Sequence, residues 1–176
     1  MQSYNECFSR VKNYCFKYIS NQETKNQKFK NKDRMIKSFL IPICFWIAKK
    51  SKTKDTLIIG LSGGQGAGKT TISSIISLIL KKYFNLNVFK ISIDDFYKTR
   101  KERKLLSKNK HPLLMTRGVP GTHDIDLMLH FFKKIQTKNF KEFKLPKFNK
   151  AFDDRYKKKH WYKLKSKPDI VIFEGW

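Results

Sequence analysis

The sequence predicts a three-layer α/β fold built on a parallel sheet. Three short apolar runs rich in branched residues, at residues 57–61, 88–93 and 170–173, have the character of buried parallel strands. Residues 72–80 and 123–135 have the apolar content of helices that pack on a sheet. Because strands alternate with helices along the chain, the sheet is expected to be parallel and covered by helices.

The segments outside these runs predict the rest of the chain. Residues 1–54 predict a helical, lysine-rich N-terminal extension with a polar stretch at 20–32, and residues 55–176 predict the α/β core. The apolar run 39–48 is too short to span a bilayer and contains Pro42, so it predicts a helix packed on the core. Residues 98–110 predict a polar loop. Thr122 or Asp124 is placed to cap the helix that follows.

Composition supports a folded protein with an extreme basic excess. The 176 residues are 40% hydrophobic and 14% aromatic, and 39 Lys and Arg against 14 Asp and Glu give a net charge of +25. This charge fits either a nucleic-acid or anionic-surface binder, or a lysine-rich composition without a specific partner. Because lysines are spread from Lys12 to Lys167 without a compact block, we expect no specific nucleic-acid partner and no membrane partner.

The cysteines indicate a reducing environment. The sequence has three cysteines, Cys7, Cys15 and Cys44, and no C-x-x-C motif. An odd number without that motif predicts neither a disulfide framework nor a zinc site. We therefore expect a cytoplasmic setting.

The strongest motif follows the first predicted strand. Residues 63–70 fit the pattern G-x-x-x-x-G-K-[ST], between an apolar strand and an apolar helix, which is the context that a phosphate-binding loop requires. Lys69 is expected to reach the β- and γ-phosphates of a nucleoside triphosphate, and Thr70 to supply a hydroxyl to Mg²⁺. The residues expected to cradle the phosphates are Gly63, Gly64, Gln65, Gly66, Ala67, Gly68, Lys69, Thr70 and Thr71.

Acidic residues stand at two strand ends. Asp94 and Asp95 follow the second predicted strand, and Glu174 ends the last one. The carboxyl ends of strands line the ligand crevice of such sheets, where a carboxylate can accept a proton from an acceptor hydroxyl or hold Mg²⁺. The alternative is that these acids cap turns or helices.

Five motifs in this order resemble the D-glycerate 3-kinase family, which is similar to uridine kinase, phosphoribulokinase and pantothenate kinase. They are G-G-Q-G-A-G-K-T-T, S-I-D-D-F-Y, H-P-L-L-M-T-R-G-V-P-G-T-H-D, P-K-F-N-K-A-F-D-D-R and V-I-F-E-G-W, and the resemblance runs from about Phe39 to Trp176. It implies a P-loop kinase that transfers phosphate from ATP to D-glycerate with Mg²⁺.

The resemblance also implies roles for individual residues. Asp94 matches the general base, with Lys69 and Asp95 beside it in the catalytic set, and Glu174 matches the Mg²⁺ partner that acts with Thr70. The residues expected near the acceptor are Arg117, His123, Asp124, Lys150, Asp154 and Arg155. Arg117 or Arg155 suits the acceptor carboxylate, because a guanidinium grips a carboxylate with two hydrogen bonds. The alternative is that these arginines pair with Asp153 or Asp154 and hold loops in place.

Two departures from the family pattern bear on activity. Asn149 stands where the family has Asp in F-D-K-A, which removes a charge. The family also continues beyond E-G-W, so we expect a C-terminally incomplete core. Three functions therefore stay open: a D-glycerate kinase, a kinase of another small hydroxy compound, and a non-catalytic ATP-binding fragment or a module completed by another chain.

Overall fold

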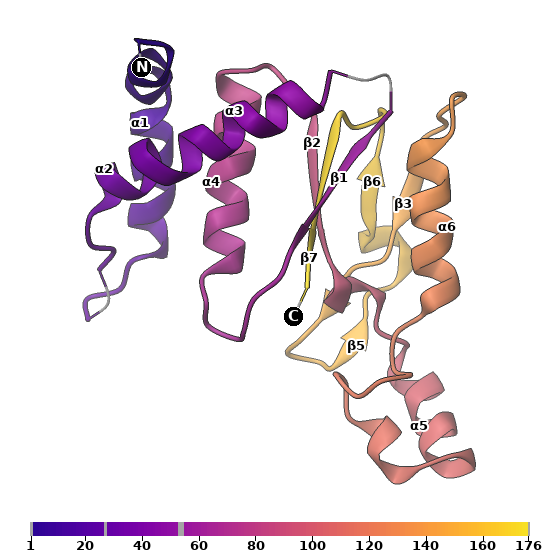
Figure 1. Ribbon diagram of the computed structural model, residues 1–176. Coiled ribbons are helices and arrows are strands. Elements are labelled where there is room, and N and C mark those ends of the chain that lie inside the picture. The colour runs from indigo at the N-terminus through magenta and orange to yellow at the C-terminus, as the bar shows by residue number, and fades with distance from the viewer. Residues whose placement is uncertain (1, 27, 53–54, 176) are drawn as a thin grey trace. The chain divides into compact units, whose positions relative to one another are not determined.

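The structure, a computed structural model, describes residues 2–26, 28–52 and 55–175 (Figure 1). The chain forms two compact units. The first runs to Lys90 and includes Pro168–Glu174, and the second comprises Ile91–Lys167 with Gly175.

A three-stranded sheet with the order β1-β7-β2 contains the predicted strands. The strands are β1 (Leu57–Leu61), β7 (Ile170–Glu174) and β2 (Val88–Ser92). β1 and β7 are parallel, with Leu57 opposite Ile170 and Leu61 opposite Glu174. The predicted α/β class is confirmed, and this register places the end of β7 beside the start of the loop that follows β1.

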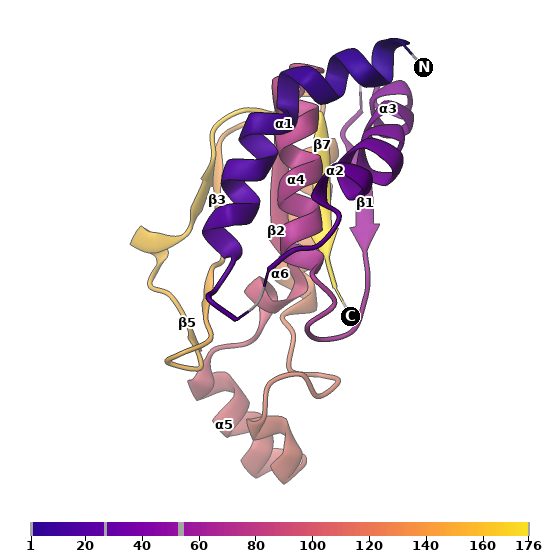
Figure 2. The same cartoon turned by 90° about the vertical axis from the view of Figure 1, so that its left-hand side faces the viewer.

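Helices build the rest of the first unit. They are α1 (Gln2–Gln22), α2 (Lys32–Arg34), the π-helix η1 (Met35–Leu40), α3 (Ile41–Lys50) and α4 (Lys69–Lys82). Figures 1 and 2 show α4 beside the sheet, with α1 on the other side of α4. A continuous apolar core joins α1, η1, α3, α4 and β7 through Cys7, Val11, Cys15, Ile19, Ile36, Ile41, Cys44, Ile47, Ile75, Ile79, Ile170 and Ile172. The predicted helix at 39–48 therefore packs on the core, as expected.

The second unit is built from short elements. They are η2 (Ile93–Phe96), α5 (Arg100–Asn109), η3 (Pro112–Met115), α6 (Ile125–Gln136), β3 (Phe143–Leu145), β4 (Phe148–Asn149), β5 (Asp154–Arg155), η4 (Lys158–His160) and β6 (Tyr162–Leu164). β3 pairs antiparallel with β6, and β4 with β5. Phe131 of α6 lies with its ring centroid 6.0 Å from that of Phe96 and 6.4 Å from that of Phe143.

The predicted loop at residues 98–110 is wrong, because α5 occupies most of it. Thr99 caps this helix: Glu102 N donates to Thr99 Oγ1 at 3.3 Å, and Thr99 N donates to Glu102 Oε2 at 2.7 Å. This reciprocal cap starts a helix whose only apolar residues are Leu105 and Leu106, so a search for apolar runs did not reveal it.

The predicted start of the next helix is confirmed. α6 begins after Asp124, whose Oδ1 accepts a hydrogen bond from Leu127 N at 3.1 Å. Among the helices of the described residues, none is both long enough and apolar enough to cross a membrane.

Candidate active site

The predicted phosphate loop connects β1 to α4 and is largely exposed. Gly66 and Gly68 have φ angles of 79° and 77°, a region that favours glycine, and Gly68 immediately precedes α4. Lys69 Nζ lies across the loop and donates to the carbonyl oxygens of Gly63 at 2.5 Å and Gly64 at 2.8 Å. The loop thus keeps its cation folded inward at the N-terminus of α4, which is an arrangement suited to an anion.

Thr70 and Glu174, the predicted metal pair, lie together. Thr70 Oγ1 donates to Glu174 Oε2 at 3.2 Å, and Ser73 Oγ donates to Glu174 Oε1 at 2.5 Å. Mg²⁺ in proteins takes oxygen ligands, often one carboxylate together with phosphate oxygens and water. A hydroxyl and a carboxylate at the edge of the phosphate loop fit that preference.

The structure adds Ser73 to this group, which sequence reasoning missed. It lies three residues after Thr70 on α4, so both side chains share one helix face. That spacing was the available signal, since a second hydroxyl at this distance reaches whatever the first one contacts.

Lys90 is a second residue that sequence reasoning missed. Its Nζ donates to Ser74 Oγ at 2.5 Å, and Ser74 Oγ donates to Thr70 O at 2.6 Å. Burial lowers the pKa of Lys90, although the nearby charge of Glu174 acts in the opposite direction. Nothing in the sequence distinguishes Lys90 from the other lysines.

In the second unit, Asp94 is the accessible member of the acidic pair. Its Oδ2 lies 2.6 Å from Lys150 Nζ, with the side chains of Asp94 and Lys150 exposed by 20% and 66%. The backbone N–H of Asp94 donates to Ser92 Oγ at 3.2 Å, which fixes the turn that follows β2. The Asp94 carboxylate is thus held beside an exposed cation at the carboxyl end of a strand.

Asp95 is buried and bound to the backbone. Its Oδ1 accepts from Phe148 N at 3.1 Å, and its Oδ2 accepts from Ser92 N at 3.2 Å. Burial raises the pKa of Asp95, aided by the charge of Asp94 and opposed by the two hydrogen bonds and Lys150. Through these two hydrogen bonds, Asp95 joins β4 to the end of β2.

The two arginines predicted to grip the acceptor both have protein partners. Arg117 Nη1 lies 2.7 Å from Asp153 Oδ1 and donates to Lys150 O at 3.1 Å. Arg155 Nη2 lies 3.1 Å from Asp124 Oδ2 and donates to Tyr97 O at 2.7 Å. The pairing of Arg117 with Asp153 agrees with the alternative prediction, in which the arginines pair with Asp153 or Asp154 and hold loops in place. Arg155 instead pairs with Asp124.

Asp154 and His123, also predicted near the acceptor, make contacts within the second unit. Asp154 Oδ1 accepts from Arg100 N at 2.8 Å. His123 is buried and stacks on Tyr97, with ring centroids 4.2 Å apart. Burial lowers the pKa of His123, against the attraction of the Asp94 charge, so its imidazole is neutral near pH 7.

Arg103 is the largest fully buried side chain and was not anticipated. Its guanidinium donates to Met115 O at 2.7 Å and to Asp153 O at 2.5 Å, and it forms an ion pair with Asp153 Oδ2 at 3.0 Å. It therefore ties α5 to the end of η3 and to the turn between β4 and β5. Its place in a run of lysines gave no sign of this role.

A chain of contacts connects Arg103 to the candidate base. Arg103 and Arg117 share Asp153, Arg117 holds the backbone of Lys150, and Lys150 meets Asp94. Burial opposes ionisation of Asp153, but the hydrogen bonds and charges of Arg117 and Arg103 outweigh it and lower its pKa. Asp153 has a φ of 51°, so the turn that carries Lys150 includes a residue in the left-handed region.

A parallel sheet whose first strand runs through a glycine-rich turn into a helix, with an acid at a neighbouring strand end, defines the P-loop nucleotide-binding class. Within that class, residues 58–176 match the model of the Phosphoribulokinase / Uridine kinase family, and the chain belongs to this family.

Several relatives refine this placement. The chain is 36% identical over 126 residues to an uncharacterised kinase of Schizosaccharomyces pombe, covering 68% of this chain and 45% of that one. It is 32% identical over 157 residues to the chloroplastic D-glycerate 3-kinase of Arabidopsis thaliana, covering 78% of this chain and 34% of that one. The structure of D-glycerate 3-kinase from Cryptococcus neoformans var. grubii superposes with a TM-score of 0.63 at 29% identity, covering 78% of this chain and 49% of that one.

These findings confirm the resemblance to the D-glycerate 3-kinase group that the motifs indicated. The chain spans about half, or less, of the length of these relatives. The family implies nucleotide use and a small-molecule acceptor, and the relatives include both glycerate kinases and uncharacterised kinases.

Proposed function

We propose that this chain carries the ATP-binding and acceptor-binding portions of a kinase that phosphorylates D-glycerate. The observation that carries the proposal is the contact between Asp94 and Lys150, which places a carboxylate and a cation together at a strand end. An acceptor with adjacent hydroxyl and carboxylate groups matches such a pair, and D-glycerate has both. The D-glycerate 3-kinases among the relatives support this choice.

ATP would be bound in the first unit. The backbone N–H groups of the loop and the N-terminus of α4 would hold the phosphates, and Lys69 would leave the carbonyls of Gly63 and Gly64 to meet the β- and γ-phosphates. Thr70 and Glu174 would hold Mg²⁺. When bound, this ion neutralises charge on the phosphate oxygens.

The acceptor would be bound in the second unit. Asp94 would accept the proton of the glycerate hydroxyl and so make its oxygen a better nucleophile. Lys150 would attract the glycerate carboxylate, because it is the most exposed cation of the set and has one acidic partner. Arg117 and Arg155, already paired with Asp153 and Asp124, would orient Lys150 and the surrounding turns.

Nucleotide binding is tested on the chain itself. Calorimetric titration with ATP and Mg²⁺ should give a saturable heat, and Lys69→Ala should remove most of that affinity, because a single ammonium meets two phosphates. A folded parent chain without magnesium-dependent ATP affinity would refute the proposal.

The acceptor is tested in a chimera that adds the C-terminal segment of a D-glycerate 3-kinase. Lys150→Met should raise the KM for D-glycerate by about tenfold or more, the worth of a charged hydrogen bond, with little change in the KM for ATP. Lys144→Met, which removes an exposed lysine of β3, is the matched control. Equal KM values for glycerate in the two variants would assign the carboxylate to another residue.

A further inference from the structure

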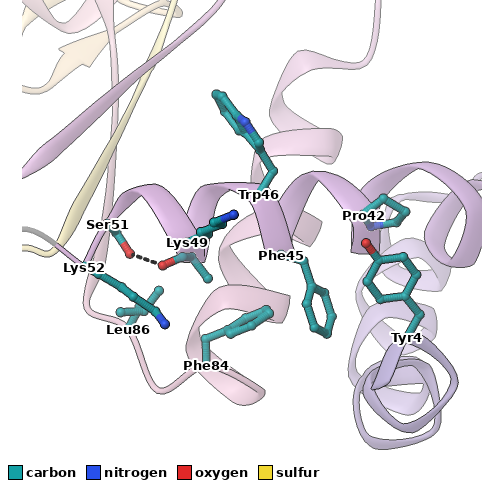
Figure 3. A pocket seen from close by; sticks show the side chains of 10 residues that line it. Tyr4, Pro42, Phe45, Trp46, Lys49, Ser51, Lys52, Phe84 and Leu86 are labelled. Carbon is teal, nitrogen blue, oxygen red and sulfur yellow. Dashed lines mark hydrogen bonds between the residues drawn. The ribbon is translucent and has the colours of Figure 1, made fainter. Parts of the chain in front are cut away.

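A pocket of about 630 Å³ lies in the first unit, outside the phosphate loop (Figure 3). Its walls come from α1, from α3 and from the segment that follows α4, through residues such as Tyr4, Phe45 and Phe84. This volume is in the range of small-molecule sites. None of the residues proposed for catalysis lines it.

The body of the pocket is aromatic and offers few hydrogen-bonding groups. The ring of Phe45 lies 4.6 Å from that of Tyr4 and meets the edge of Phe84 at 4.9 Å, measured between centroids. Trp46 stands at the rim with 59% of its surface exposed. The hydroxyl of Ser51 donates to Ala48 O at 3.1 Å, so its proton is already used. Such walls suit a ligand with an apolar body.

The charge of the pocket has one sign. Lys49 and Lys52 are the charged side chains among its lining residues, and both are exposed. The surrounding segment, residues 35–52, contains four lysines and no Asp or Glu. An anionic head group would therefore meet two cations and no carboxylate from this segment. The lysines also lie near the C-terminus of α3, where they complement the helix dipole.

We propose that this pocket binds a free long-chain carboxylate of the fatty-acid class, with its acyl chain along the aromatic walls and its head between Lys49 and Lys52. A nucleotide fits less well, because the walls offer few hydrogen-bonding groups to a base, chiefly the hydroxyl of Tyr4 and the indole N–H of Trp46. A bilayer surface also fits less well, because the aromatic walls line a hollow and a flat lipid surface does not enter one.

The proposal makes two quantitative demands. The affinity must rise with the length of the acyl chain, because each buried methylene adds apolar contact. We expect dodecanoate to bind at least about tenfold more tightly than octanoate on this ground. The affinity must also depend on the head group, so dodecanol, which has the same chain length without charge, should bind at least about tenfold more weakly than dodecanoate.

The test is calorimetric titration of the full chain with monomeric dodecanoate at ~0.15 M salt, where long-range attraction by the net charge is screened. The double variant Lys49→Gln/Lys52→Gln should weaken binding by about tenfold or more. Lys50→Gln is the matched control, since Lys50 is an exposed neighbour on the same helix that does not line the pocket. Its affinity should stay within about twofold of the parent, because the single positive charge that it removes lies outside the pocket.

A second variant tests the hollow itself. Ala48→Trp should fill the pocket and abolish binding. The variants Lys49→Gln/Lys52→Gln and Lys50→Gln change only surface residues, so their thermal midpoints should equal that of the parent. These lysine variants test the proposal if Ala48→Trp does not fold. The proposal fails if dodecanoate does not bind, if Lys50→Gln weakens binding as much as the double variant, or if dodecanol binds equally well. It also fails if phosphatidylglycerol vesicles bind through Lys49 and Lys52 while monomeric dodecanoate does not.

Discussion

Two adjacent carboxylates, Asp94 and Asp95, differ in what surrounds them. Asp94 is partly exposed and faces Lys150, whereas both oxygens of Asp95 accept backbone hydrogen bonds. The sequence marked both residues as candidates because they share a strand end. The family resemblance named Asp94 as the base, but nothing in the sequence indicated the backbone contacts of Asp95, because its partner Phe148 lies 53 residues away.

This difference predicts that substitution of Asp94 lowers turnover, whereas substitution of Asp95 lowers stability. In the chimera with a complete C-terminal segment, Asp94→Asn should lower turnover by ~10²–10⁴-fold, the typical worth of a positioned base, while ATP affinity changes little. Asp95→Asn should lower the free energy of unfolding of the chain by about 1–3 kcal/mol, because one buried N–H loses its acceptor. Steady-state kinetics and urea unfolding measure the two effects. Unchanged turnover in Asp94→Asn would move the base to another residue.

Arg103 gives a second residue-level prediction. Arg103→Met should lower the free energy of unfolding by about 2–3 kcal/mol, since it removes the donor to two part-buried carbonyls and one of the two arginine partners of Asp153. The exposed Arg100→Met should stay within about 0.5 kcal/mol of the parent. Arg103 helps to hold the pKa of Asp153 low, so its stabilisation is present above the ordinary carboxyl pKa and is lost as the pH falls through the lowered value. Urea unfolding at pH 7 and pH 3 should therefore show the gap between parent and Arg103→Met narrowing in acid.

At the scale of elements, local pattern decides which parts of the fold are predictable. Apolar runs predicted the strands β1, β2 and β7, and one motif predicted the loop before α4. These predictions succeeded because residues that are neighbours in the sequence carry the pattern. α5 was missed although Thr99 and Glu102 form a capping box, because only two of its ten residues are apolar. Arg103 and Lys90 were missed for a different reason: their contacts join distant segments, and composition hides them among other basic residues.

Helices α1 and α3 share three thiols that yield an element-level prediction. Burial raises the pKa of Cys7 to about 11 and of Cys15 to about 12, and raises that of Cys44 further. Unfolded thiols lose their protons near pH 8.5, so above that pH the unfolded chain binds fewer protons than the folded chain. Stability present at neutral pH is therefore lost as the pH rises, by at most about 1.4 kcal/mol per thiol per pH unit.

Urea unfolding at pH 7 and pH 10 checks this expectation. The variant Cys7→Ala/Cys15→Ala/Cys44→Ala should lose less stability between the two pH values than the parent does, although cavities lower its stability at pH 7. The native parent should also react slowly with a thiol reagent, because all three thiols are buried. An equal alkaline loss in parent and variant would show that lysine titration causes it.

At the scale of the whole molecule, the dominant property is the net charge of +25. Part of it serves defined contacts: Lys69 with the phosphate loop, Lys150 with Asp94, and the buried or paired arginines of the second unit. Most lysines are instead spread over the chain with no compact basic block. Charge of this kind raises non-specific attraction to polyanions without selecting a sequence.

Binding to nucleic acid should therefore be weak, independent of sequence and steeply dependent on salt. Affinity that comes from neutralising phosphates falls linearly on a logarithmic plot against salt concentration, because binding releases counterions. Fluorescence anisotropy with two unrelated 20-mer duplexes should give equal affinities at low salt and no measurable complex at ~200 mM salt. Dodecanoate, whose binding we attribute partly to apolar walls, should bind the same chain at that salt with little loss, which makes it an internal control for folded protein. A duplex that is preferred over the other and still bound at ~200 mM salt would instead indicate direct base contacts, and the lysine-rich surface would then have a specific partner.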